Sequence, residues 1–291
     1  MSKQDIADYY DRNTRVFLRI GASSGALALH RGLWDAETAN AAAAADAVHT
    51  LLAEEAMRQL GSAPRRILDL GCGVGGSVFA LLERFPEATA LGVTLSAAQV
   101  ELARAHAAAR QRSARACFLQ ADFESLDGLA VDAGGFDLVI AIESLAHADA
   151  VGAVFDAAQR MMDARRSLLL IVDDTLTPGT LTPTQERSVA RFRTGWQLPG
   201  LSTADALKAY ARSAGLDVCL NRNLTPRIRT RRLRDLAVRA VAPVLHGLGV
   251  KHPFAGNLCG GAALSAALEN GAIEYRLLGF HPTTEAAAPT D

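Results

Sequence analysis

The regular alternation of short apolar runs with helical patterns after residue 65 constrains the fold of this chain most strongly. The runs fall at residues 67–70, 90–95, 116–120, 136–142 and 167–172. Segments with a helical spacing of apolar residues lie between most of them. Strands that alternate with helices in this way form a parallel sheet with crossover helices on its faces. The alternation therefore predicts an α/β fold for residues 65–280.

The flanking segments predict additions to this sheet. Helical patterns at 5–20 and 34–60 predict an N-terminal helical cap over residues 1–64. Three prolines interrupt the alternation at 173–200, which we interpret as a lid insertion. The remaining predicted elements are a helix at 203–214, a strand at 216–220, a helix near 230–247, a last strand at 272–280 and a flexible tail at 281–291.

Composition excludes several classes of protein. The chain has 291 residues, 49% of them hydrophobic, and a formal net charge of -1, which indicates neither disorder nor a bulk attraction to nucleic acid or anionic membranes. The four cysteines form no C-x-x-C pair, so no metal site or disulfide framework is predicted. No apolar run reaches the roughly 18 residues of a membrane span, and a cytoplasmic enzyme is predicted. The oligomeric state, a homo-oligomer included, stays open.

A glycine-rich turn follows the first apolar run, where residues 69–76 read DLGCGVGG. Glycines let the backbone turn tightly and let a ligand approach it closely. A G-x-G-x-x-G match alone is equally compatible with a dinucleotide. Asp69, on the strand before the glycines, favours another ligand, because its carboxylate would neutralise an ammonium group and repel a pyrophosphate.

The pattern E/D-x-G-x-G-x-G resembles motif I of class I S-adenosylmethionine-dependent methyltransferases. The resemblance implies a Rossmann-like fold with a seven-stranded, mostly parallel sheet and an antiparallel last strand. It also implies that S-adenosylmethionine is the cofactor. Asp69, Gly71, Cys72 and Gly73 are then cofactor-binding residues.

The end of the second apolar run departs from the commonest version of this family. Many such folds place an acidic residue there to bind the ribose hydroxyls, whereas this chain has Thr94. The segment GVTLSAAQ at 92–99 resembles sterol, tocopherol, cyclopropane-fatty-acid and prenyl-diphosphate methyltransferases. In those enzymes threonine and glutamine contact the ribose, which implies a cofactor site with Thr94, Leu95 and Gln99. Ser96 also fits a helix N-cap.

Two further segments match the family. After the third run, the resemblance implies that Asp122 accepts a hydrogen bond from the adenine amino group and that Phe123 packs on the ring, although an exposed loop aspartate is an alternative. In the cap, it implies that Tyr10, His30 and Arg31 approach the methionine carboxylate. Arginine is a natural partner for that group.

The fourth run ends in Ile142 and is followed by Glu143 and, four residues later, His147. Ligands of a doubly wound sheet bind at the carboxyl ends of its strands, so Glu143 should face the cleft. The I-E-S-x-x-H segment resembles sterol methyltransferases and prenyl diphosphate C-methyltransferases. There an acidic residue stabilises a carbocation and assists proton loss, a role that Glu143 is predicted to fill. A loop-anchoring carboxylate is the alternative, and His147 is either a proton relay or a structural histidine.

Other residues bear on the acceptor substrate. Tyr9, Trp196 and Tyr275 are predicted to bind it, and the C-terminal segment at 256–275 resembles terpenoid C-methyltransferases. An arginine cluster at 222–239 either forms a solvated helix face or grips a diphosphate. The adjacent acids Asp173 and Asp174 either hold Mg²⁺ with such a substrate or make structural contacts.

These observations predict a methyltransferase that acts on an alkene carbon of a prenyl diphosphate or related isoprenoid. Methyl transfer to oxygen, nitrogen or an aromatic carbon of another small metabolite is the alternative. A third hypothesis is a cofactor-binding protein without catalysis. Neither a nucleic-acid partner nor a membrane span is predicted.

Overall fold

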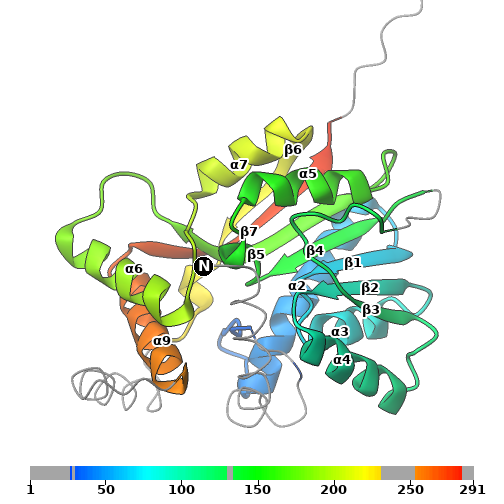
Figure 1. Ribbon diagram of the computed structural model, residues 1–291, viewed down its shortest axis with the longest axis horizontal. Helices are drawn as coiled ribbons and strands as arrows, with labels where there is room; N and C mark the ends of the chain where they lie inside the picture. The colour runs from blue at the N-terminus through cyan, green and yellow to red at the C-terminus, as the bar shows by residue number, and fades with distance from the viewer. Residues whose placement is uncertain (1–26, 28–29, 130–133, 231–252, 284–291) are drawn as a thin grey trace, which may run out of the picture.

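The computed structural model describes residues 27, 30–129, 134–230 and 253–283 and is built around a seven-stranded sheet (Figure 1). The strands lie side by side in the order β3-β2-β1-β4-β5-β7-β6. Strands β1 to β5 run parallel, and β7 runs antiparallel to both β5 and β6. Their bounds are β1 (Arg66–Leu70), β2 (Thr89–Thr94), β3 (Ala116–Gln120), β4 (Leu138–Ile142), β5 (Leu168–Leu176), β6 (Leu216–Asn223) and β7 (Ile273–Pro282). The predicted α/β fold with an antiparallel last strand is confirmed.

Helices cover both faces of the sheet (Figure 1). One face carries α2 (Ala41–Leu60), α3 (Gly76–Arg84) and α4 (Ala97–Ala109). The other face carries α5 (Val151–Met161) and α7 (Ala204–Ser213). Helices α6 (Pro183–Trp196) and α9 (Pro253–Glu269) pack on each other beside the sheet, and two short 3-10 turns are η1 (Leu145–His147) and η2 (Thr225–Arg227).

Burial on both faces explains why the strands read as continuous apolar runs. In β5, Leu168 and Leu170 pack in the core under α2 and α3, whereas Leu169 and Ile171 pack in the core under α5 and α7. All four side chains are 2% exposed or less. A parallel sheet between two helical layers requires apolar residues at successive strand positions, and this requirement explains the continuous apolar runs in the sequence.

Several boundaries differ from the predicted ones. β5 extends to Leu176 because residues 173–176 pair with β7, so the first part of the predicted lid at 173–200 lies in the sheet. β7 extends to Pro282, into the predicted tail. α2 begins only at Ala41, where the Asn40 side chain accepts a hydrogen bond from the Ala43 backbone and caps the helix.

The predicted lid also contains a helix, α6, that the apolar pattern did not indicate. Thr182 and Gln185 form a capping box at the start of α6, and Pro183 occupies its first turn. The predicted helices at 5–20 and 230–247 lie outside the described residues. Within the described ranges, every helix is too short or too polar to traverse a bilayer. The division into cap, catalytic domain and lid stays a prediction.

Candidate functional site

The glycine-rich turn between β1 and α3 lies at the carboxyl ends of three parallel strands. Gly71, Gly73 and Gly75 all adopt left-handed backbone conformations, with φ of 88°, 53° and 87°. The Gly71 and Cys72 amides both donate to the carbonyl of Val93 at 2.9 Å, which ties the turn to the end of β2.

The turn also packs closely against the end of β4. A Cβ on Gly71 would lie 2.4 Å from the Cβ of Ser144, and the Ser144 hydroxyl donates to the Leu70 carbonyl at 2.6 Å. Only glycine fits this position, because a side chain would both strain the backbone and overlap Ser144.

Asp69 lies on β1 beside this turn, and its side chain is buried in an unusual state. It is 2% exposed, and its Oδ2 atom accepts no hydrogen bond within the described residues. Burial raises the pKa of this carboxyl to about 7. A buried carboxylate without a partner is unfavourable, so this position fits a cationic group supplied by a ligand. The ammonium of a methionine moiety meets that requirement.

The predicted ribose-binding pair comes together at the end of β2. The Thr94 hydroxyl donates to Oε1 of Gln99 at 2.7 Å, and both residues are buried. The Ser96 hydroxyl accepts a hydrogen bond from the Gln99 amide, so Ser96 caps α4 as its sequence position indicated. The side chain of Gln120 donates to the Leu95 carbonyl at 3.0 Å and joins the ends of β2 and β3.

The two predicted adenine-contacting residues follow β3. Phe123 is 7% exposed, and its ring lies 3.7 Å from the position of a Cβ on Gly71, so it borders the glycine turn. Asp122 accepts a hydrogen bond from the Glu124 amide at 2.9 Å, which shapes the loop. Both residues lie on the same edge of the sheet as Asp69, as the family pattern requires.

Glu143, immediately after β4, has a strained backbone and an asymmetric set of contacts. Its φ is +48°, in the left-handed region that is rare for residues other than glycine. Its Oε1 atom accepts three hydrogen bonds, from the Arg31 amide at 2.9 Å, the Arg31 Nε at 3.0 Å and the Tyr275 hydroxyl at 2.9 Å. Its Oε2 atom accepts none within the described residues. The side chain is 12% exposed.

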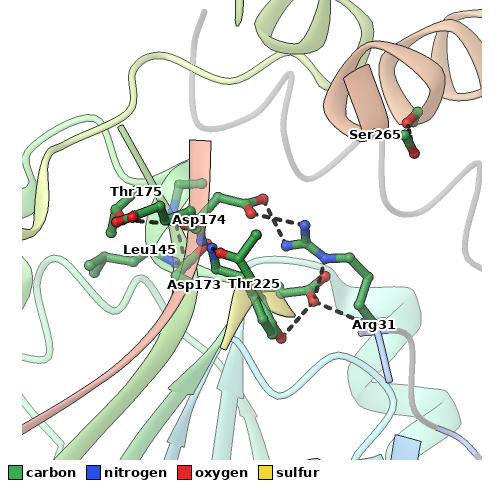
Figure 2. Close-up of polar contacts among 12 residues, drawn as sticks. Arg31, Leu145, Asp173, Asp174, Thr175, Thr225 and Ser265 are labelled. Atoms are coloured by element: carbon green, nitrogen blue, oxygen red, sulfur yellow. Dashed lines mark hydrogen bonds and ion pairs between the residues drawn. The ribbon is translucent and has the colours of Figure 1, made fainter. Parts of the chain in front are cut away.

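Arg31 joins Glu143 to the end of β5. Its Nη1 and Nη2 atoms donate to Oδ1 and Oδ2 of Asp174 at 2.9 and 2.7 Å, and Figure 2 shows this side chain reaching Asp174. Its guanidinium carbon lies 4.3 Å from the centre of the Tyr275 ring. Although burial opposes ionisation, the charge of Arg31 holds the pKa of Glu143 below its usual value. The predicted partner of the methionine carboxylate thus binds two protein carboxylates here.

Asp173 shapes the loop that carries Glu143. Its Oδ2 accepts hydrogen bonds from the amides of Leu145 at 2.8 Å and Ala146 at 3.3 Å, and its Oδ1 from the Asp174 amide at 2.7 Å (Figure 2). Burial and the neighbouring Asp174 raise its pKa to about 7. The structure therefore uses these two acids for structural contacts. Among the described residues, no group of three His, Cys, Asp or Glu side chains is arranged to hold a metal ion.

Two histidines, His30 and His147, interact electrostatically with Glu143. His147 lies in η1, and its burial lowers its pKa to about 4 despite the opposing charge of Glu143. His30 lies beside Arg31, and its Nε2 is 3.0 Å from Nε2 of His49, which is 3.1 Å from the Ser77 hydroxyl. These two contacts connect His30 to the first turn of α3. No spacing in the sequence predicted them.

The predicted substrate-binding residues have different surroundings. Tyr275 is fully buried, and its hydroxyl donates a hydrogen bond to Oε1 of Glu143, while its contact with a substrate stays a prediction. Trp196 packs against Phe192 and donates to the Asn257 carbonyl at 3.3 Å, in the cluster formed by α6 and α9. Tyr9 and Tyr10 lie outside the described residues.

Three arginines of the predicted cluster contact the protein itself. Arg222 pairs with Glu55 of α2 at 2.8 Å, and Arg227 pairs with Asp35 at 3.1 Å. Arg229 lies over the Trp34 ring. The rest of the cluster, from residue 231, lies outside the described residues.

A family model described as a methyltransferase domain matches residues 67–164, the stretch that carries the glycine turn, the Thr94–Gln99 pair and Glu143. Residues 67–164 are thus a methyltransferase domain, and the seven-stranded sheet around them is the class I S-adenosylmethionine-dependent methyltransferase fold. This methyltransferase is 29% identical to O-methyltransferase rstn1 of Aspergillus nomiae over 214 residues, which cover 74% of this chain and 89% of rstn1.

Solved structures share the fold of this methyltransferase. The [4+2]-cyclase SpnF has a TM-score of 0.74 at 22% identity, with 98% of this chain and 97% of SpnF covered. Geranyl diphosphate C-methyltransferase from Streptomyces coelicolor, solved with Mg²⁺, geranyl diphosphate and S-adenosyl-L-homocysteine, has a TM-score of 0.70 at 17% identity, with 97% of each chain covered. These neighbours have different activities, so the shared fold does not determine the acceptor.

Proposed function

We propose that this methyltransferase transfers a methyl group to a hydroxyl oxygen of a neutral small molecule that lies against Oε2 of Glu143. The supporting observation is the asymmetry of this carboxylate, whose Oε1 accepts three hydrogen bonds while Oε2 accepts none within the described residues. One oxygen anchors the side chain. The other is available to an acceptor.

The chemistry follows from the charges of the site. Bound S-adenosylmethionine supplies an electrophilic methyl group. Asp69 holds the ammonium end, and Glu143 stays ionised because Arg31 lowers its pKa. A neutral hydroxyl becomes positively charged as it gains a methyl group, and a fixed carboxylate in a site with little water stabilises that charge. Oε2 of Glu143 then accepts the hydroxyl proton. Burial lowers the pKa of His147 to about 4, so this neighbouring histidine stays neutral and leaves the negative charge of Glu143 in place.

Two observations favour oxygen over an isoprenoid carbon. The relative rstn1 is named an O-methyltransferase and is aligned over most of both chains. The described groups that a diphosphate and Mg²⁺ would need are engaged elsewhere, because Arg222 and Arg227 pair with protein carboxylates and Asp174 pairs with Arg31.

Methylation of a prenyl diphosphate carbon is the second candidate. The geranyl diphosphate C-methyltransferase fold covers nearly the whole chain, and the same Oε2 would stabilise a carbocation as well as it accepts a proton. This reaction would use Glu143 as the acid that assists proton loss. Arginines beyond residue 230 would then have to bind the diphosphate.

Incubation with methyl-labelled S-adenosylmethionine separates the two candidates. One acceptor panel contains neutral phenols and alcohols, and the other contains C5 to C15 prenyl diphosphates with and without Mg²⁺. Mass spectrometry of the products is expected to show a labelled methoxy group in the first panel. Products from the second panel alone would overturn the proposal in favour of the second candidate.

Glu143→Gln tests the role of the carboxylate. The variant should keep its affinity for S-adenosylmethionine and lose roughly a hundredfold or more in kcat, because an amide neither takes the proton nor stabilises a positive charge. The matched control is Glu101→Gln, at an exposed position of α4. Unimpaired kcat of Glu143→Gln with every accepted substrate would refute this role.

A further inference from the structure

Asp174 is well placed to control the state of Glu143. It lies near the end of β5, its side chain is 3% exposed, and its two oxygens bind both Nη atoms of Arg31 at 2.9 and 2.7 Å. Arg31 contacts Glu143 through its amide and its Nε, and both of these donate to Oε1 alone. The two carboxylates thus share one guanidinium unequally.

The chemistry of arginine makes this division significant. A guanidinium fork binds a carboxylate best through two parallel hydrogen bonds, one to each oxygen. Asp174 receives that arrangement and Glu143 does not. Without Asp174, the Nη groups of Arg31, whose side chain is only 17% exposed, would lose both of their carboxylate acceptors, which is unfavourable. Oε2 of Glu143 is the nearby acceptor that accepts no other hydrogen bond within the described residues.

We propose that Asp174 is a positioning residue that keeps Oε2 of Glu143 open for the acceptor by holding the Nη groups of Arg31. The inference rests on the proposed function, because it concerns the oxygen that faces the acceptor. The ring of Tyr275 supports the arrangement, since the guanidinium carbon stacks 4.3 Å above it and the Tyr275 hydroxyl holds Oε1. With the guanidinium plane fixed, loss of Asp174 leaves Glu143 as the carboxylate within its reach.

Crystal structures of the full-length variants test the geometry without an acceptor. In Asp174→Asn and Asp174→Ala we expect an Nη atom of Arg31 within hydrogen-bond distance of Oε2 of Glu143. The control is Asp137→Asn, which removes a carboxylate that binds the Arg65 and Arg66 amides at the opposite end of β1. Its Arg31 and Glu143 should stay unchanged. An open Oε2 in both Asp174 variants would overturn the proposal.

Calorimetry with S-adenosylmethionine shows whether the variants are folded, and we expect wild-type affinity. Kinetics then use an acceptor from the panels above. Asp174→Asn should lower kcat roughly ten- to hundredfold with little change in KM, because capture of Oε2 removes the proton acceptor. The acid limb of its pH profile should move to lower pH, since a two-point contact with Arg31 stabilises the ionised Glu143 further.

A double-mutant cycle distinguishes positioning from a general structural role. Adding Arg31→Met to Asp174→Asn removes the group that captures Oε2, but it also removes the charge that lowers the pKa of Glu143. The activities are therefore compared at alkaline pH, where Glu143 is ionised without Arg31 and the double variant should be more active than Asp174→Asn alone. Additive losses would contradict positioning by Asp174. If crystals show Oε2 captured while kcat is unaffected, the inference about Asp174 stands and the proposed role of Glu143 fails.

Discussion

The carboxyl group of Asp69 has no hydrogen-bond partner for Oδ2 within the described residues, and burial raises its pKa to about 7. In the proposed assignment of Asp69 to the cofactor, binding uses the ionised form, because a carboxylate forms an ion pair with an ammonium group and a neutral carboxyl does not. Below pH 7 the free enzyme holds a proton that binding must displace. We expect the affinity for S-adenosylmethionine to fall by up to about tenfold per pH unit between pH 7 and pH 5.5, measured by calorimetry.

The variant Asp69→Asn provides the control for this pH dependence. It should bind S-adenosylmethionine roughly ten- to hundredfold more weakly at pH 8, because its amide oxygen can accept a hydrogen bond from the ammonium group but carries no charge to pair with it. Its affinity should also lose the wild-type pH dependence. Equal slopes in the two proteins would show that another group titrates.

Tyr275 was predicted to bind the substrate. In the structure its hydroxyl donates a hydrogen bond to Oε1 of Glu143 at 2.9 Å. The variant Tyr275→Phe removes one of three donors to Oε1, so the ionised carboxylate becomes less stable and less firmly oriented. We expect kcat to fall about tenfold and the acid limb of the pH profile to move to higher pH. Tyr210→Phe is the control, since Tyr210 is 42% exposed. A change confined to KM would support the original assignment to the pocket wall.

At the scale of elements, the turn from β1 to α3 depends on Gly71. Gly71 and Gly128 share a left-handed backbone, with φ of 88° and 91°, but a Cβ would meet Ser144 at 2.4 Å at Gly71 and nothing within 4 Å at Gly128. Gly128→Ala should therefore cost only backbone strain, on the order of 1 kcal/mol. Gly71→Ala should destabilise the protein by more and weaken cofactor binding at least tenfold. Urea unfolding and calorimetry measure both, and equal effects would contradict the close packing.

The elements that sequence predicted best are those buried on both faces of the sheet. The run at 116–120 matches β3 at both ends, and the run at 90–95 matches β2 within one residue. The fifth apolar run was predicted to end at 172, before the proline-containing segment 173–200, whereas β5 continues through Asp173 and Asp174 to Leu176. Those acids are nevertheless buried, since backbone amides and Arg31 satisfy them. Hydrophobic pattern alone cannot reveal such partners.

Within the candidate site, contacts between residues close in sequence were predictable, and contacts between distant residues were not. Thr94 and Gln99 are five residues apart, on a strand end and the first turn of a helix, so a local motif was enough to pair them. Arg31 and Asp174 are 143 residues apart and meet only because the cap segment reaches the end of β5. No sequence spacing predicts such a contact, and the family resemblance implied the methionine carboxylate as the partner of Arg31 instead.

At the scale of the whole molecule, the site lies where the cap segment meets the carboxyl ends of the strands. Separate apolar cores fill the two faces of the sheet, and the pair formed by Glu55 of α2 and Arg222 of β6 ties a helix of the first layer to the sheet edge. Asp69 and Glu143 lie at the carboxyl ends of neighbouring strands, β1 and β4, so the positions proposed for the cofactor and the acceptor are adjacent. Binding and stability are therefore coupled through the same buried carboxylates.

That coupling predicts how the stability of the molecule responds to pH. The pKa of Asp69 is raised to about 7 in the folded protein from 3.8, so the unfolded chain releases this proton first as pH rises. Between about pH 4 and pH 7 this difference lowers the free energy of unfolding by up to about 1.4 kcal/mol per pH unit. Above pH 7 the loss stays constant. Without cofactor, the free energy of unfolding of Asp69→Asn should thus exceed that of wild type by more at pH 8 than at pH 5.

Saturation with S-adenosylmethionine should reverse this order at pH 8, because a ligand stabilises the state to which it binds more tightly. The cofactor should then raise the free energy of unfolding of wild type more than that of Asp69→Asn, because only wild type has a carboxylate to pair with the ammonium group. Urea unfolding of both proteins at pH 5 and pH 8, with and without the cofactor, measures the effect. If Asp69→Asn were less stable than wild type without cofactor at both pH values, Asp69 would have a partner inside the protein and its assignment to the cofactor would fail.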